Sequence, residues 1–191
     1  MTPLLATRIN IIGILGISGV LLGAYYVQFV EGEFPCPLCL LQRLAMLGVA
    51  FGAMLNLRYG IHTRHYAVSL ISAILGACVS TRQILLHIVP GAGASGFGSS
   101  VMGLHLYTWA LIVFATVILI IGIMMFFETQ FEEKENNKST KDLSLFIKVV
   151  FFLVVIIAAA NVVTTFLECG FGQCPDNPIS YKVLSWIFVH P

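Results

Sequence analysis

Five apolar runs, separated by short polar connections, dominate the hydropathy pattern of the chain. A helix needs about 20 apolar residues to cross the hydrocarbon core of a bilayer. The first run is longer than the apolar part of a signal peptide, about 7 to 15 residues, and no clear cleavage site follows it, so we expect it to be retained. The runs cover residues 11–30, 39–57, 66–89, 104–127 and 145–167. The pattern predicts an all-α membrane protein with five spans.

The composition agrees with this prediction. Hydrophobic residues make up 58% of the 191 residues and charged residues only 10%, compared with about 25% charged residues in soluble domains. The formal net charge of +1 gives no field that would gather nucleic acid, and the chain contains no nucleic-acid-binding motif. Soluble and nucleic-acid-binding classes are therefore set aside.

Lysine and arginine lie almost entirely on one side of the predicted membrane, and short loops rich in these residues stay in the cytoplasm. The cations on that side are Arg8, Arg58, Arg64, Lys134, Lys138, Lys141 and Lys148. The other side holds Glu31, Glu33, a loop without charge at 90–103 and a tail with one cation, Lys182. We expect the N-terminus in the cytoplasm and the C-terminus outside.

This topology places two cysteine pairs in the outer compartment, where disulfides persist. Cys36 and Cys39 begin the second span, and Cys169 and Cys174 directly follow the fifth. Cys78 lies alone in the third span, where we expect it to pack as a small buried apolar residue.

The first pair has features of a redox couple. A CxxC sequence at the start of a helix favours a thiolate, because the N-terminal amides stabilise an anion there. Pro37 fits the first helical turn, and Arg43 shares a helix face with Cys39, four residues earlier. A metal site built from all four outer cysteines and a structural disulfide are alternatives, whereas a c-type haem would need histidine where Leu40 stands.

Three motifs carry a resemblance to a known family. They are FPCPLCLLQR at the head of the second span, TRQILLH at the end of the third and MGLHLYTWALI at the start of the fourth. Together they resemble the DsbB family of bacterial disulfide-bond-formation proteins. The resemblance implies a four-helix transmembrane bundle, here with a fifth transmembrane helix. It also implies an inner-membrane thiol oxidase that passes electrons from a periplasmic DsbA-like protein to ubiquinone or menaquinone.

The same resemblance suggests roles for individual residues. Cys36 and Cys39 would be the quinone-linked pair, with Cys39 next to the quinone ring, and Arg43 would assist quinone binding. Arg82 and His87, at the outer end of the third span, are further candidates for the quinone pocket, with interfacial roles as the alternative. Gln42 and Gln83 could each bind a quinone oxygen or bridge helices.

The chain differs from the family in the position of one cysteine pair. In the family the second cysteine pair lies between the third and fourth spans, where this chain has a Gly- and Ser-rich loop without cysteine at 90–103. We expect Cys169 and Cys174 to replace that pair and to hand electrons from the partner to Cys36 and Cys39. We expect no metal ligand among these residues.

The resulting organisation has three parts: a DsbB-like core at 1–127, a cytoplasmic linker at 128–145, and the fifth span with its periplasmic tail at 146–191. The end of the tail is compatible with a short interfacial helix. Two other functions stay open, a non-catalytic metal-binding membrane module and a quinone reductase similar to vitamin K epoxide reductase.

Overall fold

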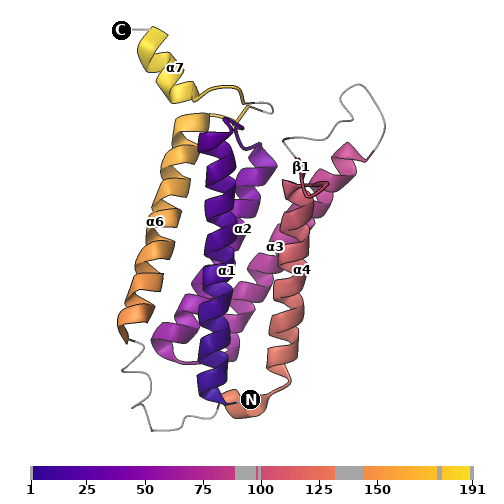
Figure 1. Cartoon of the computed structure of the whole chain (residues 1–191), viewed down its shortest axis with the longest axis vertical. Coiled ribbons are helices and arrows are strands. Elements are labelled where there is room, and N and C mark those ends of the chain that lie inside the picture. The colour runs from indigo at the N-terminus through magenta and orange to yellow at the C-terminus, as the bar shows by residue number, and fades with distance from the viewer. Residues whose placement is uncertain (1, 89–97, 99, 132–143, 176–177, 190–191) are drawn as a thin grey trace.

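The computed structural model describes residues 2–88, 98, 100–131, 144–175 and 178–189 (Figure 1). Five of its helices are long and apolar enough to cross a membrane, which confirms the predicted all-α membrane protein. They are α1 (Pro3–Val30), α2 (Pro37–Tyr59), α3 (Thr63–His87), α4 (Leu106–Met125) and α6 (Ser144–Cys169). The shorter described elements are β1 (Ser100–Val101), β2 (Leu104–His105), η1 (Glu128–Gln130) and α7 (Lys182–Val189).

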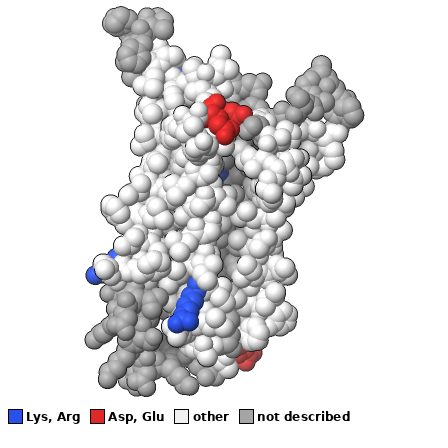
Figure 2. Space-filling model, in the orientation of Figure 1, with Lys and Arg blue, Asp and Glu red and all other residues white. Residues whose placement is uncertain are grey.

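The first four long helices form the predicted bundle, and α6 adds a fifth rod against it. Figure 1 shows α6 along one flank of the molecule and α4 along the other. The fifth helix packs against α1 and α2. The start of α2 and the end of α6 lie at the same end of the bundle, so both cysteine pairs are at that end (Figure 1). Most of the surface seen in Figure 2 is uncharged, as expected for a surface that faces lipid.

The attachment of α6 follows from a stripe along one of its faces. Buried residues recur every three or four positions, the spacing that keeps side chains on one side of a helix. They are Val150, Val154, Ile157, Asn161, Thr164 and Glu168. Tyr25 of α1 donates a hydrogen bond from its hydroxyl to the backbone oxygen of Ile157 (3.3 Å). The apolar part of the stripe belongs to the same core cluster as buried residues of α1 and α2.

Small residues bring α2 and α3 close together. A Cβ atom on Gly48 would lie 2.9 Å from the Cβ of Ser72, and one on Gly52 would lie 2.7 Å from the backbone oxygen of His65. Glycine at both positions therefore permits the close approach of α2 and α3. Gly19 and Gly23 of α1 have no such packing role, because a Cβ on either meets no atom within 4 Å.

A short hairpin precedes the fourth helix, which begins at Leu106 and not at residue 104 as predicted. Ser100 pairs with His105 and Val101 with Leu104. The connecting residues Met102 and Gly103 both have positive φ, 53° and 81°, the conformation that a two-residue hairpin turn requires. The indole nitrogen of Trp109 donates to the backbone oxygen of Val101 (3.0 Å), so the hairpin is fastened to the first turn of α4.

The prediction that Cys78 is buried is wrong, because its side chain is exposed on the outer face of α3. The opposite face of this helix, which holds Gly76, Ser80 and Gln83, is the one that packs against the bundle. A thiol is apolar enough to face lipid at that depth. The tail does form a helix, α7. Most of the predicted linker and of the Gly- and Ser-rich loop lie outside the described residues.

Candidate functional site

The Cys36–Cys39 disulfide sits on the N-terminus of α2. Cys36 is the N-cap residue with an extended backbone, and its sulfur accepts a hydrogen bond from the backbone N–H of Cys39 (3.2 Å). Pro37 occupies the first turn, where the absence of an N–H group has no cost. The predicted place of the pair at a helix start is confirmed. Negative charge formed on either sulfur would meet the positive end of the helix dipole.

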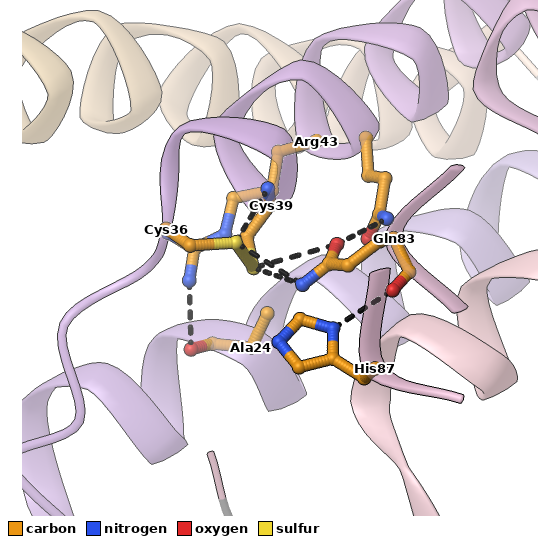
Figure 3. Close-up of a disulfide and its surroundings, with 7 residues drawn as sticks. Ala24, Cys36, Cys39, Arg43, Gln83 and His87 are labelled. Carbon is orange, nitrogen blue, oxygen red and sulfur yellow. Dashed lines mark hydrogen bonds between the residues drawn. A yellow bond between two sulfur atoms is a disulfide. The ribbon is translucent and has the colours of Figure 1, made fainter. Parts of the chain in front are cut away.

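Gln83 of α3 lies directly beside the disulfide (Figure 3). Its amide nitrogen is 3.2 Å from the sulfur of Cys36 and 3.4 Å from that of Cys39. The amide oxygen accepts a hydrogen bond from Gln42 of α2 (2.8 Å), which fixes the orientation of the side chain. Gln83 is 1% exposed. Of the two roles considered for the glutamines, the bridge between helices is present.

His87 follows one turn later on α3, near the same disulfide (Figure 3). Its Nδ1 lies 2.8 Å from the backbone oxygen of Gln83, and its ring stacks on Tyr107 of α4 with centroids 5.4 Å apart. The imidazole therefore links the end of α3 to the start of α4.

Arg43 is a buried cation, with 7% of its surface exposed. One terminal nitrogen donates to the side-chain oxygen of Gln28 (2.6 Å) and the other to the backbone oxygen of Ala24 (3.1 Å). The guanidinium also lies over the ring of Tyr25, 5.0 Å from its centroid. These contacts, all with α1, hold the charge where a free arginine would be costly.

A cavity of about 350 Å³ lies beside Cys39 and Arg43, whereas Cys36, Gln83 and His87 are not among its lining residues. Its walls come from α1, α2, α4 and the hairpin, and most of the lining is apolar. Cys39, Gln42 and Arg43 supply polar groups from α2, and Tyr107 and Trp109 supply aromatic rings from α4. Gly23 of α1 also lines the cavity. Because glycine has no side chain, no atoms beyond the backbone of α1 occupy the cavity at this position.

The second disulfide joins Cys169, the last residue of α6, to Cys174 in the following turn. Cys169 is 4% exposed, whereas Cys174 is only partly buried. The tail beyond them returns to the first site, because the hydroxyl of Tyr181 accepts a hydrogen bond from Gln28 (3.1 Å). The Tyr181 ring also packs edge-on against Phe34, with centroids 4.9 Å apart. Gln28 thus forms hydrogen bonds with both Arg43 and Tyr181 of the tail.

Arg82 is not part of this arrangement. Its side chain is exposed and lines a separate groove of about 550 Å³ on the outside of α3, together with Cys78 and apolar residues. Gln83 and Arg82 are neighbours in sequence, but successive helical residues point about 100° apart, so only Gln83 reaches the disulfide.

Glu168, a fully buried acidic residue at the end of α6, was not among the residues predicted from the sequence. Neither of its oxygens has a hydrogen-bond partner among the described residues. The sequence does contain a signal for Glu168, because an acidic residue in an apolar span is a functional candidate by default. The described residues contain no group of three or more His, Cys, Asp or Glu side chains placed to hold a metal ion.

Comparisons with known proteins agree on one family. The model of the family described as disulfide bond formation protein DsbB matches residues 6–96. Disulfide bond formation protein B 1 of Pseudomonas fluorescens strain Pf0-1 is 31% identical, over 53% of this chain and 79% of the relative. Disulfide bond formation protein B of Pseudomonas syringae pv. tomato is 40% identical, over 45% of this chain and 54% of the relative.

No solved structure matches the chain. The family match ends before the fourth helix and does not include Cys169 or Cys174. The N-terminal region holds the CxxC motif, Arg43 and Gln83 within the matched residues. With its five membrane-spanning helices and these relatives, the chain belongs to the DsbB family of membrane-embedded disulfide oxidoreductases.

Proposed function

We propose that the protein is an inner-membrane thiol oxidase that reoxidises a periplasmic DsbA-like, thioredoxin-fold protein and passes the electrons to ubiquinone or menaquinone. The observation that carries the proposal is the shared cavity. Cys39 and Arg43 line one apolar space between helices, at the end of the bundle that also holds the second disulfide.

The residues of this cavity fit a quinone head group. Small-molecule sites are commonly concave and mostly apolar, about 300 to 1,000 Å³ in volume, with a few polar groups that orient the ligand. The cavity of about 350 Å³ has this character, and Arg43 offers a cationic donor group at its wall. When bound there, the quinone would supply a two-electron acceptor next to Cys39. His87, stacked on Tyr107 of the cavity wall, is the second candidate for this site, and the position of Arg82 does not support a role for that residue.

The protein groups around the first disulfide favour its opening toward a thiolate. The N-terminal amides of α2, the charge of Arg43 and the amide of Gln83 all stabilise negative charge on sulfur. Cys36 is buried, so a soluble partner does not reach it directly. A second pair that can meet the partner is therefore needed.

The C-terminal pair is suited to that task. A thiolate of the partner attacks the more exposed Cys174, the S–S bond breaks, and Cys169 leaves as a thiolate. The second partner thiolate then displaces Cys174 from the mixed disulfide, which completes the oxidation of the partner. The reduced pair next opens the Cys36–Cys39 disulfide by the same exchange, so two electrons and two protons move inward and the C-terminal disulfide re-forms.

The charges of the chain support one orientation. Arg58 and Arg64 flank the connection between α2 and α3, which favours a cytoplasmic location for that end of the bundle. Both disulfides then face the periplasm. In this arrangement residues 1–127 form the quinone-linked core, 128–145 a cytoplasmic linker, and 146–191 the unit that meets the partner.

Purified full-length protein in lipid nanodiscs provides the test. We expect it to oxidise a reduced thioredoxin-fold substrate only when a quinone is supplied, and Cys39→Ser to abolish this turnover. Cys78→Ser is the matched control, because that thiol lies on the lipid-facing side of α3. Turnover that persists in Cys39→Ser, or that needs no quinone, would contradict the proposal.

The relay has its own test. We expect a substrate variant that lacks its second thiol to accumulate a mixed disulfide with Cys174 of the wild-type protein, because the substrate thiolate opens the Cys169–Cys174 bond and no second thiolate then displaces Cys174. If the double variant Cys169→Ser/Cys174→Ser still oxidises the same substrate at the original rate, the C-terminal pair is not the entry point.

A further inference from the structure

Glu168 is a buried acid without the contacts that a buried acid needs. It is 0% exposed, and neither carboxylate oxygen accepts a hydrogen bond from any described residue. A carboxylate in this setting loses its hydration and gains nothing from hydrogen bonds, so only a nearby cation can favour its charged form. The protonation state of Glu168 therefore depends on how much positive charge is available close to it.

That cation is Arg43. Glu168 lies on the stripe of α6 that packs against α1 and α2. One turn earlier on the same stripe, Thr164 contacts Tyr25, and the Tyr25 ring lies 5.0 Å from the guanidinium carbon of Arg43. Among the described residues, Arg43 is the charged group that acts electrostatically on Glu168.

The other ionisable groups facing Arg43 are phenols. Tyr25 comes from α1 and Tyr181 from the tail, and neither is a carboxyl group. Lys182, the cation that begins α7, lies beside Gly172 in the disulfide loop. In the oxidised protein, Glu168 is thus the one anion described that acts on the Arg43 charge.

Reduction introduces a second anion. Cys39 lines the same cavity as Arg43 and lies one helical turn before it, so a Cys39 thiolate would also be stabilised by this guanidinium. Two anions then share one buried cation in a region of low dielectric constant, where like charges repel strongly. The less well solvated of the two is the carboxylate without hydrogen-bond partners.

We propose that Glu168 and the Cys39 thiolate compete for Arg43, so that reduction of the Cys36–Cys39 disulfide drives a proton onto Glu168. This inference rests on the proposed function. Two electrons break the S–S bond, one proton makes Cys36 a thiol, Cys39 stays a thiolate, and the second proton makes Glu168 a neutral carboxylic acid. The two thiols of the partner protein supply both electrons and both protons, and the net charge of the site does not change.

The consequence is a proton stored next to the electron acceptor. When Cys39 passes its electrons on, Arg43 becomes available to the carboxylate again and Glu168 releases its proton. A quinone takes up two protons with its two electrons. Glu168 is thus a positioning residue for charge and protons, and it acts on the sulfur through Arg43.

The pH dependence of the disulfide equilibrium tests this directly. If reduction takes up two protons, the equilibrium constant for reducing Cys36–Cys39 falls about a hundredfold per pH unit; with one proton it falls about tenfold, a difference of about 30 mV per pH unit. We expect the wild type to follow the first slope between about pH 7.5 and about pH 8.5, where the carboxyl is ionised before reduction, and Glu168→Gln the second. Full-length protein would be equilibrated in dithiothreitol redox buffers, and alkylated peptides would report each cysteine pair separately.

Glu33→Gln is the matched control, because Glu33 also contributes a carboxyl group to the cavity lining. We expect this variant to keep the wild-type slope. A wild-type slope in Glu168→Gln, or loss of the second proton in Glu33→Gln instead, would overturn the inference. Neither of these two results depends on turnover with quinone. A failure of this inference is therefore distinguishable from a failure of the proposed function, which would show as retained turnover in Cys39→Ser.

Infrared difference spectra give a second measurement that does not require a potential. Reduction of the wild type should produce the C=O stretch of a protonated carboxylic acid, and this band should be missing in Glu168→Gln. If reduction produces no such band in the wild type, or the same band in the variant, Glu168 is not the group that takes up the proton.

Discussion

Replacing Gln83 by leucine tests whether this amide shifts the redox equilibrium of the Cys36–Cys39 pair. Its nitrogen lies 3.2 Å and 3.4 Å from the two sulfur atoms. A hydrogen bond to a charged acceptor contributes about 1.5 to 3 kcal/mol, and a neutral one about 1 kcal/mol. The donor therefore stabilises the thiolate of the reduced state by about 0.5 to 2 kcal/mol more than the disulfide, and the middle of this range is about 1.3 kcal/mol.

For a two-electron couple, about 1.4 kcal/mol corresponds to about 30 mV. We expect Gln83→Leu to lower the reduction potential of the pair by about 30 mV, so that the reduced form becomes about tenfold less favoured. The potential is measured by equilibration with dithiothreitol buffers, alkylation of free thiols and mass spectrometry of the Cys36–Cys39 peptide.

Gln42→Leu is the matched control. It removes the hydrogen bond to the Gln83 oxygen (2.8 Å) but keeps the donor next to the sulfurs, so we expect a shift of less than about 10 mV. Thermal unfolding of both variants checks stability, because Gln83→Leu leaves the Gln42 amide unpaired at a cost of about 1 to 3 kcal/mol. An unchanged or raised potential in Gln83→Leu, or an equal drop in Gln42→Leu, would refute the reasoning.

Three further predictions concern other parts of the molecule. Arg43→Met removes a buried charged donor from the cavity wall and should lower quinone-dependent turnover about tenfold to a hundredfold, while Arg82→Met, in the separate groove, should leave it unchanged; an equal loss in both would contradict the site. Gly52→Val places a side chain where a Cβ already meets a backbone oxygen at 2.7 Å, and thermal unfolding in detergent should report a loss of about 1 to 3 kcal/mol. Tyr181→Phe removes the acceptor of the Gln28 hydrogen bond, so amide hydrogen exchange in the tail should become faster while α1 is unaffected.

The sequence predicted the spans because a bilayer imposes one length and one composition on every helix that crosses it. It also predicted the place of Cys36 and Cys39 at a helix start and the position of Arg43 one turn on, since both follow from local spacing. The roles of these residues remain predictions. The location of Cys36, Cys39 and Arg43 at one end of the bundle follows from the direction in which the second span crosses the membrane.

What the sequence did not reveal depends on the rotation of each helix about its axis. In a span that is apolar all round, periodicity does not distinguish the packed face from the lipid face. Cys78 was therefore expected to be buried and Arg82 was a candidate for the pocket or the interface, whereas both lie on the outer side of α3. Gln83 and Glu168 gain their meaning only from neighbours on other helices, and the hairpin before α4 depends on a positive φ at Met102, which is uncommon for a residue other than glycine.

The cavity beside Cys39 lies between α1 and α4, two helices whose outer surfaces border the membrane. An oxidant drawn from the lipid phase would need no route through water, and its long apolar tail could stay outside the protein among the acyl chains. Supply of the oxidant would then be set by its abundance within the plane of the membrane, and the reaction would be insensitive to its negligible solubility in the periplasm. With such an oxidant, the protein would connect two pools that do not mix: soluble thiols on one side of the interface and a lipid-soluble electron carrier on the other.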